Sequence, residues 1–329
     1  MIEKPKISVM IITYNQEDTI ERTIQSLLSQ KDFVYEICVS DDGSKDRTWE
    51  ILQKYDRENP NLFRLSQNNP NVGIFENIEK VWKMPTGDLV YLLAGDDECG
   101  EQWFEKVSDF LVNNKIDYQN KRIAVYGDYK ACYPNGDSFV FKNDIVLYRH
   151  NALGLALRRL ICNRSVCFSK KVLECFVNVS EGRSYSVESG QDRQVQIFSD
   201  YNYYIPYIGN VYYTGIGVST GKNRNGLKVD PSTPMEVIFR VLNKTDYQLP
   251  PSDITLTKFY QERALVENKL ILEPHYKYSL SYIARRLRSW YFLFLAFDLQ
   301  LGIKGFKIKR YLFAFMRRLP HNKPIEWTV

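Results

Sequence analysis

Short runs of aliphatic and β-branched residues alternate with amphipathic segments along the first 130 residues of the chain. Five runs have the length and composition of buried strands: residues 7–12, 36–40, 62–65, 89–93 and 123–126. The segments between them carry apolar residues at helical spacing: residues 20–28, 49–55, 74–82 and 101–113. Because strands and helices alternate, we expect an α/β fold whose Rossmann-like sheet is mostly parallel and flanked by helices.

After residue 130 the regular alternation ends. Residues 130–141 indicate a hairpin around Pro134-Asn135-Gly136, and residues 207–213 indicate a further strand. Helices are predicted at three places: residues 152–160, 170–176 and 192–198. From residue 234 onward the pattern indicates mainly helix. We therefore expect an α/β domain at residues 1–230 and a helical C-terminal extension at residues 231–329.

The positive charge of the chain is concentrated near its end. The whole sequence has a net charge of +5, but the stretch from Leu280 to Lys323 has ten Lys and Arg residues against one acid, Asp298. A nucleic-acid-binding protein would spread basic residues over its folded body, so we expect no nucleic-acid partner. Basic residues interleaved with aromatic ones suit contact with an anionic membrane surface. The alternative is a helical subdomain packed on the core, with its charges in solvent.

The N-terminus, the apolar runs and the cysteines indicate where in the cell the protein is expected. The N-terminus has no apolar stretch followed by a small-residue cleavage site, and the apolar runs of the basic region are far shorter than the ~20 residues that span a bilayer. The six cysteines show no CxxC spacing, and the chain has only three histidines. We therefore expect free thiols and no zinc site. We expect a cytoplasmic protein that is peripheral at the cytoplasmic face of the membrane.

Polar clusters follow three of the predicted strands at their carboxyl ends: Thr13-Tyr14-Asn15, Asp41-Asp42 and Asp96-Asp97. Ligands of open parallel sheets bind beyond these ends, so we expect the clusters to share one cleft. Adjacent carboxylates repel each other unless a cation or a donor neutralises them, and Mg²⁺ is often held by one or two carboxylates plus phosphate oxygens. No P-loop is present, and no GxGxxG follows the first strand, so the expected ligand is a metal–diphosphate complex.

Four motifs occur in the order and spacing of a known family. ISVMIITYN, ICVSDDGSKDRT, NVGIFENI and GDLVYLLAGDD resemble the motifs of the inverting family-2 glycosyltransferases of the GT-A fold, and the resemblance covers about residues 6–220. It implies that Thr13 and Tyr14 line the nucleotide pocket and that Asp42 contacts the base. It also implies that Asp96 faces the ribose or the donor sugar, and that Asp97 binds the metal, Mn²⁺ or Mg²⁺.

In this family a later acidic motif opens a helix and supplies the catalytic base. The matching stretch begins at Ser189, so the resemblance assigns the base to Asp192, with Glu188 as the alternative. A helix N-cap is the other role that Asp192 could have. The base would take the proton of the acceptor hydroxyl, whose pKa lies far above 7, while the hydroxyl attacks the anomeric carbon.

The chain departs from the family pattern in two places. Glu76 stands where a basic residue usually precedes the Asn of the third motif, so a phosphate contact there would have to come from Lys80 or Lys83. The late segment GIGVSTGKN has no obvious metal ligand, and Lys222 or Arg224 could meet the diphosphate instead. We expect this glycine-rich segment to be a lid on the acceptor side.

Taken with the family, these residues predict an inverting, metal-dependent glycosyltransferase of the hexosyl or N-acetylhexosaminyl type. It would move a sugar from a UDP-sugar to a hydroxyl of a glycan or lipid-linked acceptor, in bacterial surface polysaccharide synthesis. The alternative is a non-catalytic module that binds nucleotide or glycan on the same fold. A nucleotidyltransferase would carry a glycine- and lysine-rich loop after the first strand, where this chain has the acidic TYNQEDT.

Overall fold

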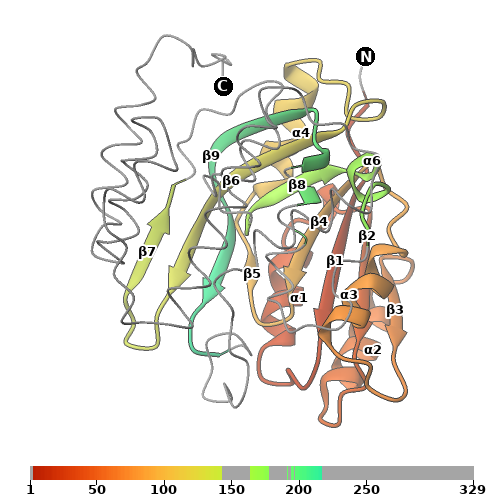
Figure 1. Ribbon diagram of the computed structural model, residues 1–329. Helices are drawn as coiled ribbons and strands as arrows, with labels where there is room; N and C mark the ends of the chain where they lie inside the picture. Colours follow the sequence, from red (N-terminus) through yellow and green to blue (C-terminus); the bar gives the residue numbers. More distant parts are fainter. Residues whose placement is uncertain (1–2, 143–163, 178–190, 192–193, 196, 217–329) are drawn as a thin grey trace, which may run out of the picture. The chain divides into compact units, whose positions relative to one another are not determined.

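A computed structural model describes residues 3–142, 164–177, 191, 194–195 and 197–216 of the chain (Figure 1). The chain divides into two units, residues 1–229 with 327–329 and residues 230–326. Every described residue belongs to the first unit, so the predicted helical extension at residues 231–329 lies outside the described residues. Within the described ranges, no helix has both the length and the apolar character needed to cross a membrane.

The first half of the domain is a parallel sheet, as predicted. Its strands are β1 (Ile7–Thr13), β2 (Glu36–Asp41), β3 (Phe63–Gln67) and β4 (Leu89–Ala94). They lie in the order β3-β2-β1-β4, and all three pairings are parallel (Figure 1). β1 and β2 are buried along almost their whole length, which explains why they are continuous apolar runs in the sequence.

Helices follow these strands along the chain at the predicted places. They are α1 (Ile20–Leu28), α2 (Thr48–Glu58), α3 (Ile74–Trp82) and α4 (Trp103–Asn113). The predicted apolar face of α1 is buried at Ile20, Ile24 and Leu27, and Leu28 is partly buried. α3 packs against β1 and β2, α2 packs against β3, and α4 packs against β9 (Tyr201–Tyr213). The α/β fold class is therefore confirmed.

The second half of the sheet mixes directions. A short strand that the sequence pattern did not predict, β8 (Val166–Ser169), lies between β4 and β6 (Ile123–Cys132) and is antiparallel to both. β9 continues the sheet parallel to β6. The two-residue strand β5 (Glu98–Cys99) pairs with β9, and β7 (Ser138–Phe141) forms the predicted hairpin with β6. Strand β6 is longer than the predicted residues 123–126, because it runs on into this hairpin.

A tryptophan at the start of α4 fixes the approach of two strands. Trp103 is fully buried, and a β-carbon built on Gly127 or Gly209 would lie 2.4 Å or 2.8 Å from its ring. Glycine at these two positions therefore allows β6 and β9 to pass close to the indole. The buried core around Trp103 includes Tyr91 and Phe104, whose rings meet edge to face at 5.3 Å.

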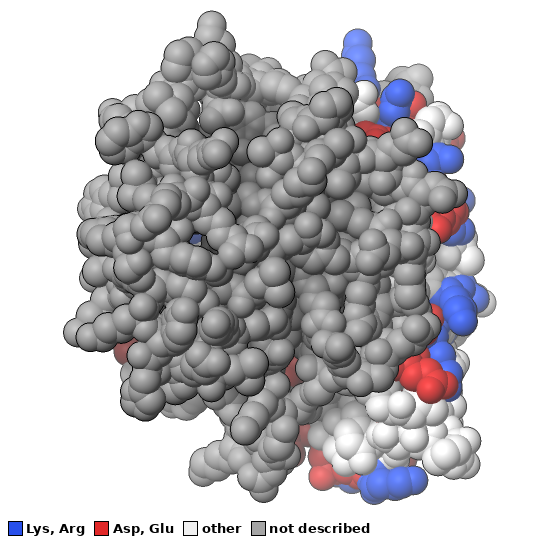
Figure 2. Space-filling view, viewed as in Figure 1, with Lys and Arg blue, Asp and Glu red and all other residues white. Residues whose placement is uncertain are grey.

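The described surface carries charges of both signs. In Figure 2, the part of the described surface that is visible shows Lys and Arg side chains interspersed with Asp and Glu. Of the six cysteines, the five in the described ranges are free thiols, as predicted: Cys38, Cys99, Cys132, Cys167 and Cys175. Burial raises the pKa of the Cys38 thiol to about 12, so at neutral pH this side chain is a small apolar group rather than a nucleophile.

Candidate active site

The predicted polar clusters meet at one edge of the sheet. In the parallel register Thr13 lies opposite Asp41, and Ile12 lies opposite Ala94, the residue that ends β4. The carboxyl ends of β2, β1 and β4 are thus adjacent, and Asp42 and Asp96-Asp97 follow directly from the outer two. This is the edge at which open parallel sheets bind their ligands.

The end of β1 presents buried acceptors to this edge. Thr13 is only 3% exposed, and its Oγ1 has no hydrogen-bond partner in the described part of the chain; the same holds for Oε1 of Gln16. Both atoms lie beside Gly95, where an added β-carbon would be 2.3 Å from Gln16 Oε1 and 3.1 Å from Thr13 Oγ1. Tyr14 is 44% exposed. Since buried polar atoms are normally paired, this edge is suited to a ligand with hydrogen-bond donors.

Asp42 holds the loop that leads into α3. Its Oδ1 accepts hydrogen bonds from the Asn68 amide and the Val72 N–H, and its Oδ2 accepts one from the Gly73 N–H, all at 2.9 Å. A carboxylate has about four acceptor positions, so the Oδ2 atom has room for one more donor. The predicted role of Asp42, contact with a nucleobase, would have to use this remaining position.

The third motif lies behind Asp42 and faces inward. The side chain of Asn77 accepts hydrogen bonds from Ser40 and Asn68 and donates one to the Ser40 carbonyl, at 2.6 to 2.9 Å. Lys80 donates to Asn68 at 2.8 Å and lies 3.7 Å from Glu76. Lys80, one of the two lysines considered for phosphate contact, is therefore engaged in supporting the Asp42 loop.

The acidic pair after β4 is largely buried. Asp96 is 9% exposed and Asp97 is 3% exposed. One carboxylate oxygen of Asp97 accepts a hydrogen bond from the Tyr213 N–H at 3.1 Å, and the other lies 3.9 Å from Nη1 of Arg164. The Arg164 guanidinium in turn lies 3.6 Å over the ring of Tyr212. The sequence pattern gave no indication of Arg164 or Tyr213, because both reach Asp97 from distant segments.

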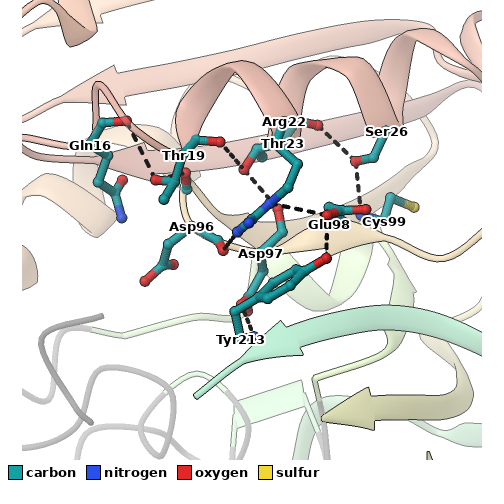
Figure 3. Close-up of polar contacts among 11 residues, drawn as sticks. Gln16, Thr19, Arg22, Thr23, Ser26, Asp96, Asp97, Glu98, Cys99 and Tyr213 are labelled. Atoms are coloured by element: carbon teal, nitrogen blue, oxygen red, sulfur yellow. Dashed lines mark hydrogen bonds and ion pairs between the residues drawn. The ribbon is translucent and has the colours of Figure 1, made fainter. Parts of the chain in front are cut away.

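One face of α1 holds the backbone of this turn (Figure 3). Five polar side chains at helical spacing run from its N-cap, Thr19, through Arg22, Thr23 and Ser26 to Gln30, two residues beyond its end. They bond to successive backbone groups at 2.7 to 3.0 Å, namely the carbonyls of Gly95, Asp96 and Asp97, the N–H of Cys99 and the carbonyl of Gly100. The apolar face predicted this helix, and the polar residues have the same periodicity, but their spacing did not indicate which groups they contact.

Tyr213 joins this helix face to the end of β9. Its hydroxyl donates a hydrogen bond to Glu98 at 2.5 Å, and the Arg22 guanidinium lies 3.7 Å from the centre of its ring. Burial, followed by the neighbouring Glu98 carboxylate, raises the pKa of Tyr213 to about 12. The phenol therefore remains a protonated donor throughout the physiological range.

The donor set suits a metal that is shared with a phosphate ligand. Among the described residues, no group of three or more His, Cys, Asp or Glu side chains could enclose an ion. The acidic pair offers one or two carboxylates, which is the protein share typical of Mg²⁺ bound together with substrate phosphates. Asp192 and its alternative Glu188 lie outside the described residues, as do Lys222 and Arg224.

Comparison with known proteins identifies relatives of this domain. The family model "Glycosyl transferase family 2" matches residues 8–168. An uncharacterised protein of Mycobacterium tuberculosis is 33% identical over 92 residues, which are 28% of this chain and 27% of that protein. The poly(ribitol-phosphate) beta-N-acetylglucosaminyltransferase TarP of Staphylococcus aureus is 28% identical over 211 residues, 61% of this chain and 62% of TarP. The matches thus cover about a quarter of the length of the first relative and less than two thirds of the length of TarP.

A solved structure shares the fold. The crystal structure of S. aureus TarS residues 1–349 in complex with UDP-GlcNAc matches with a TM-score of 0.60 and 17% sequence identity. The match covers 82% of this chain and 76% of the TarS chain. At this identity the likeness concerns the fold, and it extends over more of the chain than the family model does.

Proposed function

Through residues 8–168 the chain belongs to glycosyltransferase family 2, and from this premise we propose that it transfers a sugar from a nucleotide sugar to an acceptor hydroxyl. The transfer inverts the anomeric configuration and depends on Mg²⁺ or Mn²⁺. The proposed donor is a UDP-sugar, and the proposed acceptor is a glycan or a lipid-linked saccharide of a bacterial surface polysaccharide. UDP-GlcNAc in the TarS structure and the poly(ribitol-phosphate) acceptor in the name of TarP support these choices.

The observation that carries the proposal is the edge where β2, β1 and β4 end. Two buried acidic residues, Asp96 and Asp97, stand there beside buried acceptors of Thr13 and Gln16 that have no partner among the described residues. Buried charge is costly unless it is paired, and Asp97 is oriented by the Tyr213 N–H and approached by Arg164. Such an arrangement is suited to a ligand that combines a nucleoside with a charged diphosphate.

The proposed reaction is a single displacement. Thr13 and Tyr14 bind the nucleotide, Asp42 accepts a hydrogen bond from the base, and Asp96 faces the ribose or the donor sugar. Asp192 takes the proton of the acceptor hydroxyl as that oxygen forms its bond to the anomeric carbon. The bond from this carbon to the diphosphate breaks on the opposite face, and its electron pair leaves with the nucleoside diphosphate.

Asp97 is proposed as the ligand of the divalent metal, and Asp96 stands next to it. When bound, the metal supplies a positive charge that stabilises the leaving diphosphate. Among the described residues, the chain adds Arg164 as a cation close to Asp97, at 3.9 Å from its carboxylate. Its guanidinium helps to neutralise this buried carboxylate when no metal is bound.

The test of the function is release of UDP from a panel of UDP-sugars, with Mn²⁺ or Mg²⁺, with and without a lipid-linked acceptor. We expect metal-dependent release with at least one donor, stimulated by acceptor. Asp192→Asn is expected to keep nucleotide binding and to lose most turnover, since an amide cannot accept the proton. Near-normal transfer by this variant would remove Asp192 from the role, and no release with any donor would favour a binding module.

Membrane contact is proposed for the basic region at residues 231–329, which would bring the enzyme to a lipid-linked acceptor. Its support is the run of ten basic residues and one acid from Leu280 to Lys323. Binding of the full-length protein to anionic liposomes at low salt tests this proposal, with neutral liposomes as the control. Equal recovery in both pellets, or in neither, would show that this region does not recognise an anionic surface.

A further inference from the structure

We propose that Arg22 is a positioning residue for the acidic pair: by joining Asp96, Glu98 and Tyr213, it sets where the Asp97 carboxylate lies. The inference rests on the proposed function, because it takes Asp97 as the metal ligand. Arg22 touches neither Asp97 side-chain oxygen in the described contacts, and its influence runs through Tyr213.

Arg22 makes three different contacts from the first turn of α1 (Figure 3). Its Nη2 donates a hydrogen bond to the Asp96 carbonyl at 2.8 Å. Its Nε lies 3.0 Å from Oε1 of Glu98, and its guanidinium lies 3.7 Å over the Tyr213 ring. The planar guanidinium thus links the turn after β4 to the end of β9, which a flexible ammonium could not do in the same way.

Tyr213 connects Arg22 to the Asp97 carboxylate, the proposed metal ligand. Tyr213 donates its backbone N–H to Oδ1 of Asp97 at 3.1 Å, and its hydroxyl to the same Glu98 oxygen that faces Arg22. The ring, the hydroxyl and the N–H of Tyr213 are therefore fixed by Arg22, Glu98 and Asp97 respectively. If Arg22 is removed, the ring loses this contact, and the direction of the N–H toward Asp97 is left to the pairing of β9 with β6, in which Tyr213 lies opposite Cys132.

Other side chains on and next to α1 already support the turn after β4, so the role proposed for Arg22 differs from general support of the fold. Thr19, Thr23, Ser26 and Gln30 already hold the backbone of residues 95–100, in contacts that do not involve Arg22. The Arg22–Glu98 ion pair is part-exposed, at 35% and 26%, and such pairs add little to stability. Loss of Arg22 should therefore disturb the direction of Asp97 more than the stability of the domain.

The experiment measures binding of Mn²⁺ to the full chain saturated with UDP, by electron paramagnetic resonance or calorimetry. We expect Arg22→Gln to raise the Kd for Mn²⁺ about tenfold, the usual consequence of losing a residue that orients a metal ligand. Tyr213→Phe, which keeps the ring but loses the bond to Glu98, should give a smaller rise. Arg22→Lys should lie between Arg22→Gln and the wild type.

Arg57→Gln is the matched control, since Arg57 is exposed on α2, and its Kd for Mn²⁺ should equal that of the wild type. Unchanged Mn²⁺ binding in folded Arg22→Gln would overturn the inference and leave the proposed function intact. If Arg22→Gln does not fold, Tyr213→Phe and Arg22→Lys decide the matter by the same measurement. A wild-type chain that binds neither UDP nor Mn²⁺ would refute the proposed function, and the inference with it.

Discussion

The acidic turns after β2 and after β4 end neighbouring parts of one sheet, but their carboxylates are held in different ways. Asp42 is held by one short loop, through the Asn68 amide and two backbone N–H groups of residues 72–73. Asp97 is approached by Tyr213 and Arg164, which come from segments far along the chain. The Asp42 carboxylate is held by a nearby loop, whereas the position of the Asp97 carboxylate depends on how distant elements pack.

This difference separates a stabilising role from a chemical one. Removal of Asp42 takes away the acceptor of the Val72 N–H and loosens the loop at Asn68 and Gly73, which costs stability whether or not a ligand is bound. Removal of the charge at Asp97 leaves the Tyr213 N–H with an acceptor, but takes away the proposed metal ligand. Mutations at the two turns should therefore differ in whether they affect unfolding or turnover.

The largest effect is expected for Asp97→Asn. The amide can still accept a hydrogen bond from Tyr213, but it is a poor ligand for a hard cation, so Mn²⁺-dependent UDP release should fall about a thousandfold. The thermal unfolding midpoint should stay close to that of the wild type. The exposed Asp109→Asn on α4 is the control, and turnover of Asp97→Asn equal to this control would refute the metal role.

Asp42→Ala should mainly weaken the fold. Three hydrogen bonds to a buried carboxylate are lost, so we expect the free energy of unfolding to drop by about 3 kcal/mol. Chemical denaturation with Asp109→Ala as the reference measures this change. If Asp42→Ala unfolds at the same denaturant concentration as the reference, the loop does not depend on this carboxylate and the contrast with Asp97 fails.

Glu36 extends the comparison to the amino end of β2, away from the proposed site. Burial alone would raise its pKa, but hydrogen bonds from Ser8 and Thr86 and the nearby Arg64 outweigh burial and hold the pKa below the ordinary 4.5. A lowered pKa in the folded state stabilises the protein above the unfolded-state pKa, and this stability is lost as the pH falls through the folded-state value.

Glu36→Gln should therefore lower the free energy of unfolding at pH 7 by about 2 kcal/mol. The difference from the wild type should shrink as the pH falls below 4.5. Denaturation at a series of pH values tests this, with UDP release at pH 7 as the readout for the site. If the difference in the free energy of unfolding between the wild type and Glu36→Gln stays constant down to pH 3, the pKa of Glu36 is the same in the folded and unfolded states.

The smallest effect is expected for Gly95→Ala. Gly95 lies beside Thr13 and Gln16, at the edge of the sheet where both acidic turns begin. The new methyl group would meet Gln16 Oε1 at 2.3 Å, the end of a flexible side chain that can turn away. We expect a loss of only about 1 kcal/mol in stability, but a several-fold weaker affinity for UDP by calorimetry. Unaltered affinity would show that the acceptors of Gln16 and Thr13 do not contact the nucleotide.

The parallel half of the sheet was predictable because β1, β2 and β4 are mostly buried and helices separate the strands along the chain. Residues 74–82 were predicted as a helix and α3 is Ile74–Trp82, since its apolar spacing and the following Pro85 and Gly87 mark both its face and its end. The convergence of Thr13, Asp42 and Asp97 also followed from strand order alone. These features depend on local pattern and on a general rule of parallel sheets.

The second half was less predictable because long-range pairing determines it. β8 has only four residues, too few for a clear periodicity, and its place between β4 and β6 depends on partners far away in the sequence. Arg164 and Tyr213 were missed for the same reason. The polar face of α1 was a different case, since its spacing was visible in the sequence but carried no indication of what it would bind.

The position of β8 also has a consequence for the order in which the chain can assemble. The partner of one edge of β4, β1, precedes it in the chain, but the partner of its other edge, β8, is complete only after residues 166–169 have been synthesised. Until then this apolar strand has an open edge, which is the kind of surface that invites pairing with another chain. Non-local pairing of this sort also slows folding. During synthesis β4 therefore has one edge without its native partner until β8 has left the ribosome, and pairing of that edge with another chain is the hazard at this stage.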